Sequence, residues 1–461
     1  MPIDLPQDLM VSVSGVRGRV GDPLTPELVT AISAGFGTFM MRDGGRGPIY
    51  VGRDSRVSGP MLSRAVIAGL QSVGVEVVDL GLVPTPTLLL AVERAGACGG
   101  LVVTASHNPA EWNALKLVAG DGTFLDADRA QRFFDFLSAE EPHRAAWDEI
   151  RPVSEDGEAW SRHLEAILAL PDLDLDAIRG RRLKVAIDCV HGAGGPPMAE
   201  LLEALGCDVT AIGMTPDGHF PRDPEPTAEN LADLSELVRE SGTDVGFAVD
   251  PDVDRLSLVD ETGVATGEDL TLALAAAAVL RRTPGPVVTN LSTSQVLDDV
   301  AEAFSVTLHR SSVGEVNVAN RMKAEGAIVG GEGNGGVILS ALHYTRDAPL
   351  AAALILHHLV IEGATLSQAV ARWPAYSIRK EKITFPREAL SDAYRMLEEA
   401  LPGAALDHTD GLRLTWRKRS AWLHVRPSGT EPVVRLIAEA PSSEAANALL
   451  GQASALLDGV A

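Results

Sequence analysis

The chain has 461 residues, of which 46% are hydrophobic and 22% charged, and its formal net charge is −24. This length exceeds one ordinary hydrophobic core, so we expect about two to four domains. The excess of 63 acidic over 39 basic residues repels nucleic acids and anionic membranes, and 4% aromatic residues provide few stacking surfaces for single-stranded nucleic acid. These properties favour a soluble cytoplasmic protein without a nucleic-acid or membrane partner, and they leave the oligomeric state open.

Short local patterns agree with a cytoplasmic location. The first ten residues lack the basic and apolar regions of a signal peptide. The longest apolar run, Leu270–Leu280, is shorter than the roughly 20 residues that a membrane span needs. The cysteines are odd in number and show no C-x-x-C spacing, so we expect reduced thiols with structural roles at Cys98, Cys189 and Cys207.

One pattern recurs in the first three quarters of the chain. A β-branched apolar run, a polar or glycine-rich turn, helically spaced apolar residues and a second apolar run follow one another in Ile49–Gly81, Leu183–Gly213 and Pro286–Gly314. This is the β-turn-α-β unit of parallel α/β sheets. Three separated copies predict three related α/β domains, and the alternative is one large α/β protein with coincidental similarity.

The pattern changes after about residue 370. The stretches YSIRKEKITF and LRLTWRKRSAWLHVRPS predict strands, and SEAANALLGQASALLDGV predicts an amphipathic helix. We therefore expect a smaller α+β domain at the C-terminus. The predicted domains cover residues 1–150, 151–260, 261–370 and 371–461.

The first polar loop follows the apolar stretch GGLVVTA and contains Ser106, His107 and Asn108, with Lys116 ten residues further on. Ligands bind at the carboxyl edge of α/β sheets, so the Ser106 hydroxyl is a candidate nucleophile. Serine, asparagine and proline are also common in ordinary turns, and this local pattern leaves that alternative open.

The second polar loop, FAVDPDVDRL, places Asp250, Asp252 and Asp254 at every second position. Carboxylates this close repel one another without a cation, and an all-oxygen set suits Mg²⁺ or Ca²⁺. A calcium loop needs glycine at its sixth position, where Arg255 stands, although Glu261 occupies its twelfth. The flanks predict strands rather than helices, so the pattern favours Mg²⁺, with a solvated loop as the other alternative.

The third polar loop, IVGGEGNGGVI, sets Glu332 and Asn334 among five glycines. Glycines let the backbone approach a ligand closely, and the acid and the amide suit hydroxyl groups. No helix signal follows directly, so the loop is not a dinucleotide fingerprint. A flexible surface turn is the alternative.

The fourth polar loop, VRPSGTEPVVR, combines a guanidinium, two hydroxyls and an unhindered amide, a set that suits phosphate oxygens. These groups belong to Arg426, Ser428, Gly429 and Thr430. An ordinary hairpin turn is the alternative. Three further arginines stand among glycines and serines, and we interpret them as anion ligands: Arg17, Arg53 and Arg56. Together the loops predict a phosphorylated, hydroxyl-rich ligand, a divalent cation and a serine nucleophile.

The order of the four motifs TASHNP, DPDVDR, GEGNG and RPSGTEP resembles that of the α-D-phosphohexomutases. In that family, similar motifs form the phosphoserine, magnesium, sugar-recognition and phosphate loops. The stretches GVRG, GRDSRVSG, FPRDPEPTAENL and SVGEVNVA also resemble family segments, so the match spans nearly the whole chain. The resemblance implies four domains around a central cleft, three of them sharing an α/β core.

The resemblance also implies roles for individual residues. Ser106 would be the phosphorylated serine, with His107 beside it in the catalytic loop. Three carboxylates would hold Mg²⁺ together with the serine phosphate: Asp250, Asp252 and Asp254. Three basic residues would line the transferring phosphoryl group or the metal: Lys116, a candidate proton shuttle, Arg17 and Arg255. Sugar hydroxyls would contact Glu332 and Asn334, and the phosphate that does not react would contact Arg426, Ser428, Gly429 and Thr430.

The implied activity is the interconversion of hexose 1-phosphate and hexose 6-phosphate through a hexose 1,6-bisphosphate. The motif RPSGTEP, and SGVRG followed by LTPEL, look more like phosphoglucosamine mutases, which favours glucosamine phosphate over glucose or mannose phosphate. Many family members have serine at the position of Asn334, whose amide still donates and accepts hydrogen bonds. A magnesium-dependent sugar-phosphate phosphatase and a non-catalytic sugar-phosphate sensor are the alternatives from other classes.

Overall fold

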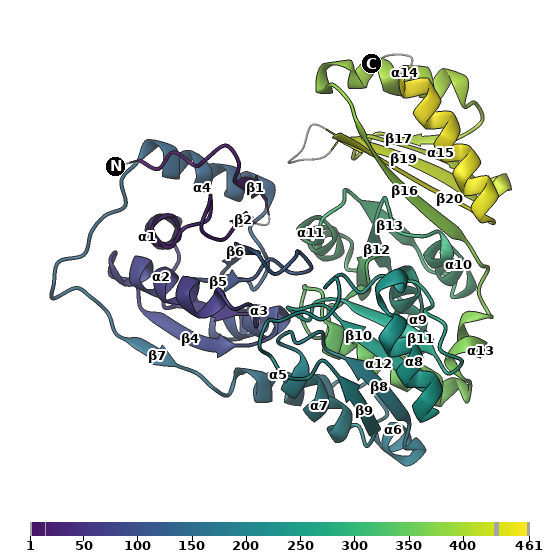
Figure 1. Ribbon diagram of the computed structural model, residues 1–461, viewed down its shortest axis with the longest axis horizontal. Helices are drawn as coiled ribbons and strands as arrows, with labels where there is room; N and C mark the ends of the chain where they lie inside the picture. Colours follow the sequence, from purple (N-terminus) through teal and green to yellow (C-terminus); the bar gives the residue numbers. More distant parts are fainter. Residues whose placement is uncertain (1, 14, 428–432, 459–461) are drawn as a thin grey trace.

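The structure is a computed structural model that describes residues 2–13, 15–427 and 433–458. Four sheets follow one another along the chain, and helices pack against each of them (Figure 1). Three of these units are α/β and the last is an antiparallel α+β domain, which confirms the predicted fold class. Among the described residues, no helix is both long and apolar enough to cross a membrane.

The first unit is a mixed seven-stranded sheet of order β1-β2-β6-β5-β3-β4-β7. Its strands are β1 (Met10–Ser12), β2 (Gly15–Arg19), β3 (Ile49–Arg53), β4 (Val77–Leu82), β5 (Gly99–Val103), β6 (Trp112–Ala119) and β7 (Val153–Glu155). Its helices are α1 (Pro26–Arg42), α2 (Gly59–Gln71), α3 (Thr85–Ala95) and α4 (Ala127–Ala139). Strand β7 pairs with β4, so this sheet takes in residues beyond position 150.

Strand β5 shows why helices cover both faces of the first sheet. Its alternate residues Leu101 and Val103 pack with α1, α2 and α4, whereas Val102 faces α3. All five residues of β5 are buried, as expected for a central strand covered on both sides. The chain leaves this strand at its carboxyl end directly before Ser106.

The second unit has the sheet order β11-β10-β8-β9. Its strands are β8 (Lys184–Asp188), β9 (Asp208–Ile212), β10 (Val245–Val249) and β11 (Leu256–Asp260). Its helices are α5 (Ala159–Leu168), α6 (Leu175–Arg181), α7 (Gly195–Ala204), the short 3₁₀ helix η1 (Ala228–Asn230) and α8 (Ala232–Ser241). The turn between the antiparallel pair β10 and β11 carries the aspartates.

The third unit has the sheet order β13-β12-β14-β15. Its strands are β12 (Val287–Asn290), β13 (Leu308–Ser311), β14 (Val329–Glu332) and β15 (Gly336–Leu339). Its helices are α9 (Glu268–Arg282), α10 (Val296–Ala303), α11 (Glu315–Glu325), α12 (Ala348–Glu362) and α13 (Leu366–Val370). The recurring pattern is therefore β3-α2-β4, β8-α7-β9 and β12-α10-β13, and each strand pair is parallel as predicted.

The second and third units share one hydrophobic core. A single cluster joins residues such as Val185 and Phe247 of the second sheet with Leu272 and Leu350 of helices α9 and α12. The apolar run Leu270–Leu280 lies in α9, nearly all of which is buried there. Burial of this run between two sheets explains its composition without a membrane.

The fourth unit is an antiparallel sheet of order β16-β20-β19-β18-β17. Its strands are β16 (Ser377–Thr384), β17 (Ala405–Asp407), β18 (Leu412–Trp416), β19 (Ala421–Pro427) and β20 (Val433–Ala440). Its helical segments are η2 (Arg387–Ala389), α14 (Leu390–Ala400), η3 (Arg417–Arg419) and α15 (Ser443–Asp458). Helices α14 and α15 pack on the sheet and close a separate core.

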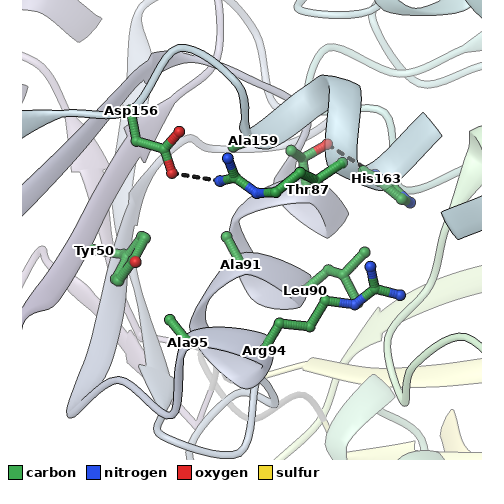
Figure 2. Close-up of a pocket in the computed structure, with 10 residues that line it drawn as sticks. Tyr50, Thr87, Leu90, Ala91, Arg94, Ala95, Asp156, Ala159 and His163 are labelled. Atoms are coloured by element: carbon green, nitrogen blue, oxygen red, sulfur yellow. Dashed lines mark hydrogen bonds and ion pairs between the residues drawn. The ribbon is translucent and has the colours of Figure 1, made fainter. Parts of the chain in front are cut away.

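A buried polar cluster joins the first three units. Nε2 of His163 and Nε2 of His343 lie 2.8 and 2.9 Å from Asp347 Oδ2, and Nδ1 of His163 lies 2.9 Å from the Thr87 hydroxyl. His163 and Thr87 border a cavity of about 330 Å³ between α3 and α5 (Figure 2). The side chains are close enough to hold a metal ion. Because each ring Nε2 already faces the carboxylate at hydrogen-bond distance, we interpret the cluster as a structural contact.

Candidate active site

The serine loop begins where β5 ends. Ser106 is 3% exposed, and its backbone has φ +51°, the left-handed region that non-glycine residues rarely adopt. The Ser106 Oγ donates to Asp250 Oδ2 at 2.9 Å and lies 3.3 Å from Nδ1 of His107. The hydroxyl therefore faces the aspartate loop, which is more than a hundred positions away in the chain.

The aspartate loop is a tight turn between β10 and β11. Asp250 Oδ1 accepts hydrogen bonds from the backbone amides of Asp254 and Arg255 at 3.1 and 3.2 Å. Val253 has φ +65°, a strained conformation for a β-branched residue. This turn directs three fully buried carboxylates to one place: Asp250, Asp252 and Asp254.

Lys116 neutralises part of this charge. Its Nζ lies 2.7 Å from Asp252 Oδ2 and 3.8 Å from Asp254 Oδ2. Burial alone would lower the pKa of Lys116, but the two carboxylates outweigh it and raise the pKa, so the amine stays protonated. Thr85 adds a hydrogen bond of 2.7 Å to the same oxygen of Asp252.

The aspartate loop suits a divalent cation. Burial and the charges of Asp254 and Asp252 raise the pKa of Asp250 well above its ordinary value. In addition, Oδ1 of Asp252 and Oδ1 of Asp254 are buried and accept no hydrogen bond from the described residues. Buried carboxylate oxygens need a donor or a cation, and oxygen ligands are those that Mg²⁺ prefers. The three carboxylates therefore fit Mg²⁺, which would relieve their mutual repulsion.

The glycine loop of the third unit reaches the aspartate loop. Gly335 has φ +85° and its carbonyl accepts from the Leu256 amide at 3.0 Å, a close approach that a Cβ would block. The Asn334 side chain accepts from the Gly336 amide at 3.2 Å. Glu332 is buried and accepts from Asn290 at 2.8 Å and from the Gly314 amide at 2.9 Å.

Arg346 links this loop to the aspartates and had no signal in the sequence. Its buried guanidinium donates to Asp254 Oδ2 at 2.6 Å and to Glu332 Oε2 at 2.9 Å, and its Nε lies 3.2 Å from Glu315. Burial acts to raise the pKa of Glu332, but Arg346 and two further donors lower it overall. Arg346 stands in the stretch HYTRDAP, outside all four loops, and only the fold brings it to them.

The remaining basic residues lie around the serine. Arg17 donates to the Asn108 side chain, and Nη1 of Arg255 donates to Glu225 at 3.1 Å. Burial, followed by the guanidinium groups of Arg255 and Arg17, lowers the pKa of His107 well below its ordinary value. The imidazole is therefore neutral near pH 7, with its Nε2 3.9 Å from Glu225.

The interpretation of Arg56 as an anion ligand is wrong. Its guanidinium is fully buried and donates to Asp54 and to backbone carbonyls of the serine loop. The neighbouring Arg53 donates to the backbone carbonyl of Asp54 at 3.1 Å. A loop position and nearby glycines are visible in the sequence, but the burial of an arginine depends on what packs over it.

The fourth predicted loop is described only at its ends. Arg426 lies at the end of β19, and its Nε is 3.0 Å from Asp410. Asp410 in turn accepts from the Val313 amide of the third unit at 3.0 Å. Ser428, Gly429 and Thr430 lie outside the described residues.

The chain matches four family models in succession. They are the phosphoglucomutase/phosphomannomutase alpha/beta/alpha domains I, II and III, over residues 9–143, 161–263 and 267–376, and the C-terminal domain over residues 388–455. The third model includes helix α9. Together the models cover most of the chain.

Individual relatives match along the same length. A "Phosphoglucomutase/phosphomannomutase" of Thermococcus kodakarensis is 38% identical over 449 residues, covering 96% of this chain and 97% of the relative. A "Probable phosphoglucosamine mutase" of Methanopyrus kandleri is 38% identical over 440 residues, covering 95% of each chain. A crystal structure of a phosphoglucomutase/phosphomannomutase family protein from Burkholderia thailandensis has a TM-score of 0.85 at 27% identity, covering 99% of this chain and 98% of that one. The chain therefore belongs to the phosphoglucomutase/phosphomannomutase family, the phosphohexomutases, which are isomerases.

Proposed function

We propose that the chain interconverts hexose 1-phosphate and hexose 6-phosphate through a phosphoserine at Ser106 and a hexose 1,6-bisphosphate intermediate. The observation that carries the proposal is the 2.9 Å contact between the Ser106 hydroxyl and Asp250, inside a buried group of three carboxylates and Lys116. The buried carboxylates beside this serine need a counter-charge, which a divalent cation would supply, and the same cation would neutralise charge on the phosphate of a phosphoserine.

In the proposed cycle, a hydroxyl oxygen of the sugar phosphate attacks the phosphorus of phosphorylated Ser106. A bond from phosphorus to the sugar oxygen forms, the bond to Ser106 Oγ breaks, and the hydroxyl proton passes to a nearby base. The bisphosphate then reverses its orientation, and Ser106 Oγ attacks its other phosphorus. The bond from phosphorus to Oγ forms, the bond to the sugar oxygen breaks, and the proton held by the base passes to that sugar oxygen. The sugar product carries its phosphate at the other end.

Three kinds of residue support this transfer. Asp250, Asp252 and Asp254 would hold Mg²⁺, which supplies charge neutralisation for the spreading charge of the transferring group. Basic residues would flank the phosphoryl group: Lys116, Arg17 and Arg255. Lys116 Nζ lies 2.7 Å from Asp252 Oδ2 and His107 Nδ1 lies 3.3 Å from Ser106 Oγ, so these two residues are the candidates for proton transfer.

The substrate end of the proposal involves the third and fourth units. Glu332 and Asn334 would contact sugar hydroxyls, and Arg426, Ser428, Gly429 and Thr430 would bind the phosphate that does not react. Glucosamine phosphate is the proposed substrate, because the C-terminal and N-terminal motifs resemble those of phosphoglucosamine mutases. Relatives with mannose/glucose and glucosamine names are equally similar at 38% identity, so mannose and glucose phosphates are the competing substrates.

One experiment tests both the reaction and the sugar. The protein is primed with glucose 1,6-bisphosphate and incubated with glucosamine, glucose or mannose 6-phosphate, and both isomer and free phosphate are measured. The proposal expects isomer without stoichiometric phosphate, and the highest kcat/KM for glucosamine phosphate. Release of one phosphate per substrate would instead establish a phosphatase, and binding without turnover would establish a sensor.

A further inference from the structure

One buried arginine donates hydrogen bonds to the backbone of the serine loop. Nη2 of Arg56 donates to the backbone carbonyls of Ser106 and Asn108, each at 2.6 Å. Its Nη1 donates to the carbonyls of Pro109 at 2.6 Å and Trp112 at 3.0 Å. Three carbonyl groups of the serine loop, and that of Trp112 at the start of β6, therefore converge on one guanidinium that is fully buried.

The fifth N–H group of Arg56 completes the set. Its Nε donates to Asp54 Oδ2 at 3.0 Å, and a guanidinium has five N–H donors in all. Every donor of Arg56 is thus used by the protein, and none is left for a phosphate. This arrangement distinguishes Arg56 from an anion ligand.

Asp54 and Thr104 connect Arg56 to the backbone amide of Ser106. The Thr104 hydroxyl donates to Asp54 Oδ2 at 2.7 Å and accepts from the Ser106 amide at 2.9 Å. Both peptide groups of Ser106 are therefore fixed by hydrogen bonds. Its N–H donates to Thr104, and its C=O accepts from Arg56. These are the two groups whose directions set the φ and ψ of Ser106.

These hydrogen bonds hold Ser106 in an unfavourable backbone conformation. A non-glycine residue in the left-handed region costs of the order of 1 to 3 kcal/mol and persists only where its surroundings impose it. With φ +51°, Ser106 would relax to ordinary backbone values if the loop were free. Such a relaxation would turn Oγ away from Asp250.

The turn after β3 that carries Ser55 and Arg56 also contacts the second unit. Ser55 donates to the carbonyl of His191 at 2.7 Å, and the amide of Ala193 donates to the carbonyl of Pro251 at 2.8 Å. The turn that carries Arg56 therefore lies between the serine loop and the segment that supports the aspartate loop. A shift of this turn would change the separation of the two loops.

From these contacts we infer that Arg56 is a positioning residue, which holds Ser106 in its strained conformation with Oγ facing the aspartates. The inference rests on the proposed function for its kinetic consequence. It does not require Arg56 to touch the substrate. Lysine cannot replace it, because a single ammonium has three donors and no planar fork.

The kinetic test compares Arg56→Lys and Arg56→Gln with the wild type. Misplacing a reacting atom by about 1 Å costs about a hundredfold in rate, so kcat should fall by about that factor. KM should change by less than about threefold, because substrate binding does not use Arg56. Arg42→Gln is the matched control, since Arg42 pairs with Glu140 on the exposed surface, and it should keep the wild-type kcat.

Hydrogen exchange provides a readout that does not depend on the reaction. Exchange of the backbone amides in residues 104–112 should be faster in Arg56→Gln and unchanged in Arg42→Gln. If Arg56→Gln does not fold, Thr104→Val removes only the hydroxyl between Asp54 and the Ser106 amide, and it should lower kcat by about tenfold.

The outcomes separate the two proposals. A raised KM at unchanged kcat would identify Arg56 as a substrate ligand and overturn the inference, as would wild-type kcat in the folded variants. If the wild type isomerises no hexose phosphate, the proposed function fails. In that case faster exchange in residues 104–112 of Arg56→Gln still supports the positioning role, and unchanged exchange refutes it.

Discussion

The Lys116 ammonium lies 2.7 Å from Asp252 Oδ2, although 136 positions separate the two residues in the chain. Lys116 comes from strand β6 of the first unit, and Asp252 comes from the turn after β10 of the second. Both side chains are almost fully buried, so the pair is shielded from salt and solvent. The first two units therefore share one set of charges at the candidate active site.

Replacing Ser106 by alanine should abolish nearly all isomerase activity and preserve the fold. The variant removes the hydroxyl that accepts the phosphoryl group, while the backbone contacts of the loop through Thr104 and Arg56 remain. Isomer formation and thermal unfolding are the measurements. Ser138→Ala, which changes an exposed hydroxyl bonded to the Asp135 carbonyl, is the control. Wild-type rates in Ser106→Ala would rule out this nucleophile.

Removal of divalent cations should inactivate the enzyme, and added Mg²⁺ should restore it. The reason is the pair of buried carboxylate oxygens on Asp252 and Asp254 that lack a donor among the described residues. Activity is measured after treatment with EDTA, after gel filtration, and again after addition of MgCl₂. Asp252→Asn should raise the Mg²⁺ concentration needed for half-maximal activity. Full activity after thorough chelation would contradict the metal role.

Replacing Arg346 by methionine should destabilise the protein by about 3 to 5 kcal/mol, because it leaves buried carboxylates without their cation. These carboxylates belong to Asp254, Glu315 and Glu332. The free energy of unfolding in urea is the measurement. Arg321→Met removes a partly exposed ion pair with Glu325 and should cost less than about 1 kcal/mol. Equal losses in the two variants would show that the buried network is not stabilising.

The contact between the third and fourth units should weaken in acid. His424 Nδ1 lies 2.9 Å from the Ser292 hydroxyl, and its Nε2 lies 2.7 Å from the carbonyl of Asp410. Nε2 donates to that carbonyl, and in the neutral ring Nδ1 accepts from the Ser292 hydroxyl. Burial lowers the pKa of His424 from 6.5 to about 4.

The sign of the effect follows from proton uptake. Between pH 6.5 and about 4 the unfolded chain binds a proton at His424 and the folded chain does not, so stability falls as the pH is lowered through this range. At pH 5 the cost is about 2 kcal/mol. Thermal unfolding at pH 7 and pH 5 should show a smaller decrease for His424→Asn than for the wild type. An identical decrease in both proteins would exclude His424 as the origin.

Much of the secondary structure could be predicted, because it depends on neighbours in the chain. The three β-α-β units and the C-terminal strands follow from local hydrophobic periodicity, and β10 and β11 flank the aspartates as expected. The merged core of the second and third units was not foreseen. Helix α9 is apolar on nearly all sides, and its sequence does not specify which two sheets enclose it.

The candidate site also contains residues that the sequence identified and residues that it did not. Ser106, Lys116 and the aspartates were named from residue type and motif, and the structure brings them together. Arg346 stands outside the four polar loops and was not identified, and Arg56, in the stretch GRDSRVSG, was misinterpreted as an anion ligand. Their different environments depend on partners distant in the chain: the Ser106 carbonyl lies 50 positions from Arg56, and Asp254 lies 92 positions from Arg346.

The sequence by itself determined which segments form strands and helices and which side chains are candidates for phosphate and metal chemistry, because local propensity and functional groups are properties of short segments. Only the tertiary structure decided which charges are buried together, which arginine supports a loop and which joins two domains. The physical reason is that desolvation and hydrogen-bond satisfaction depend on whatever packs around a group, and that packing comes from distant parts of the chain.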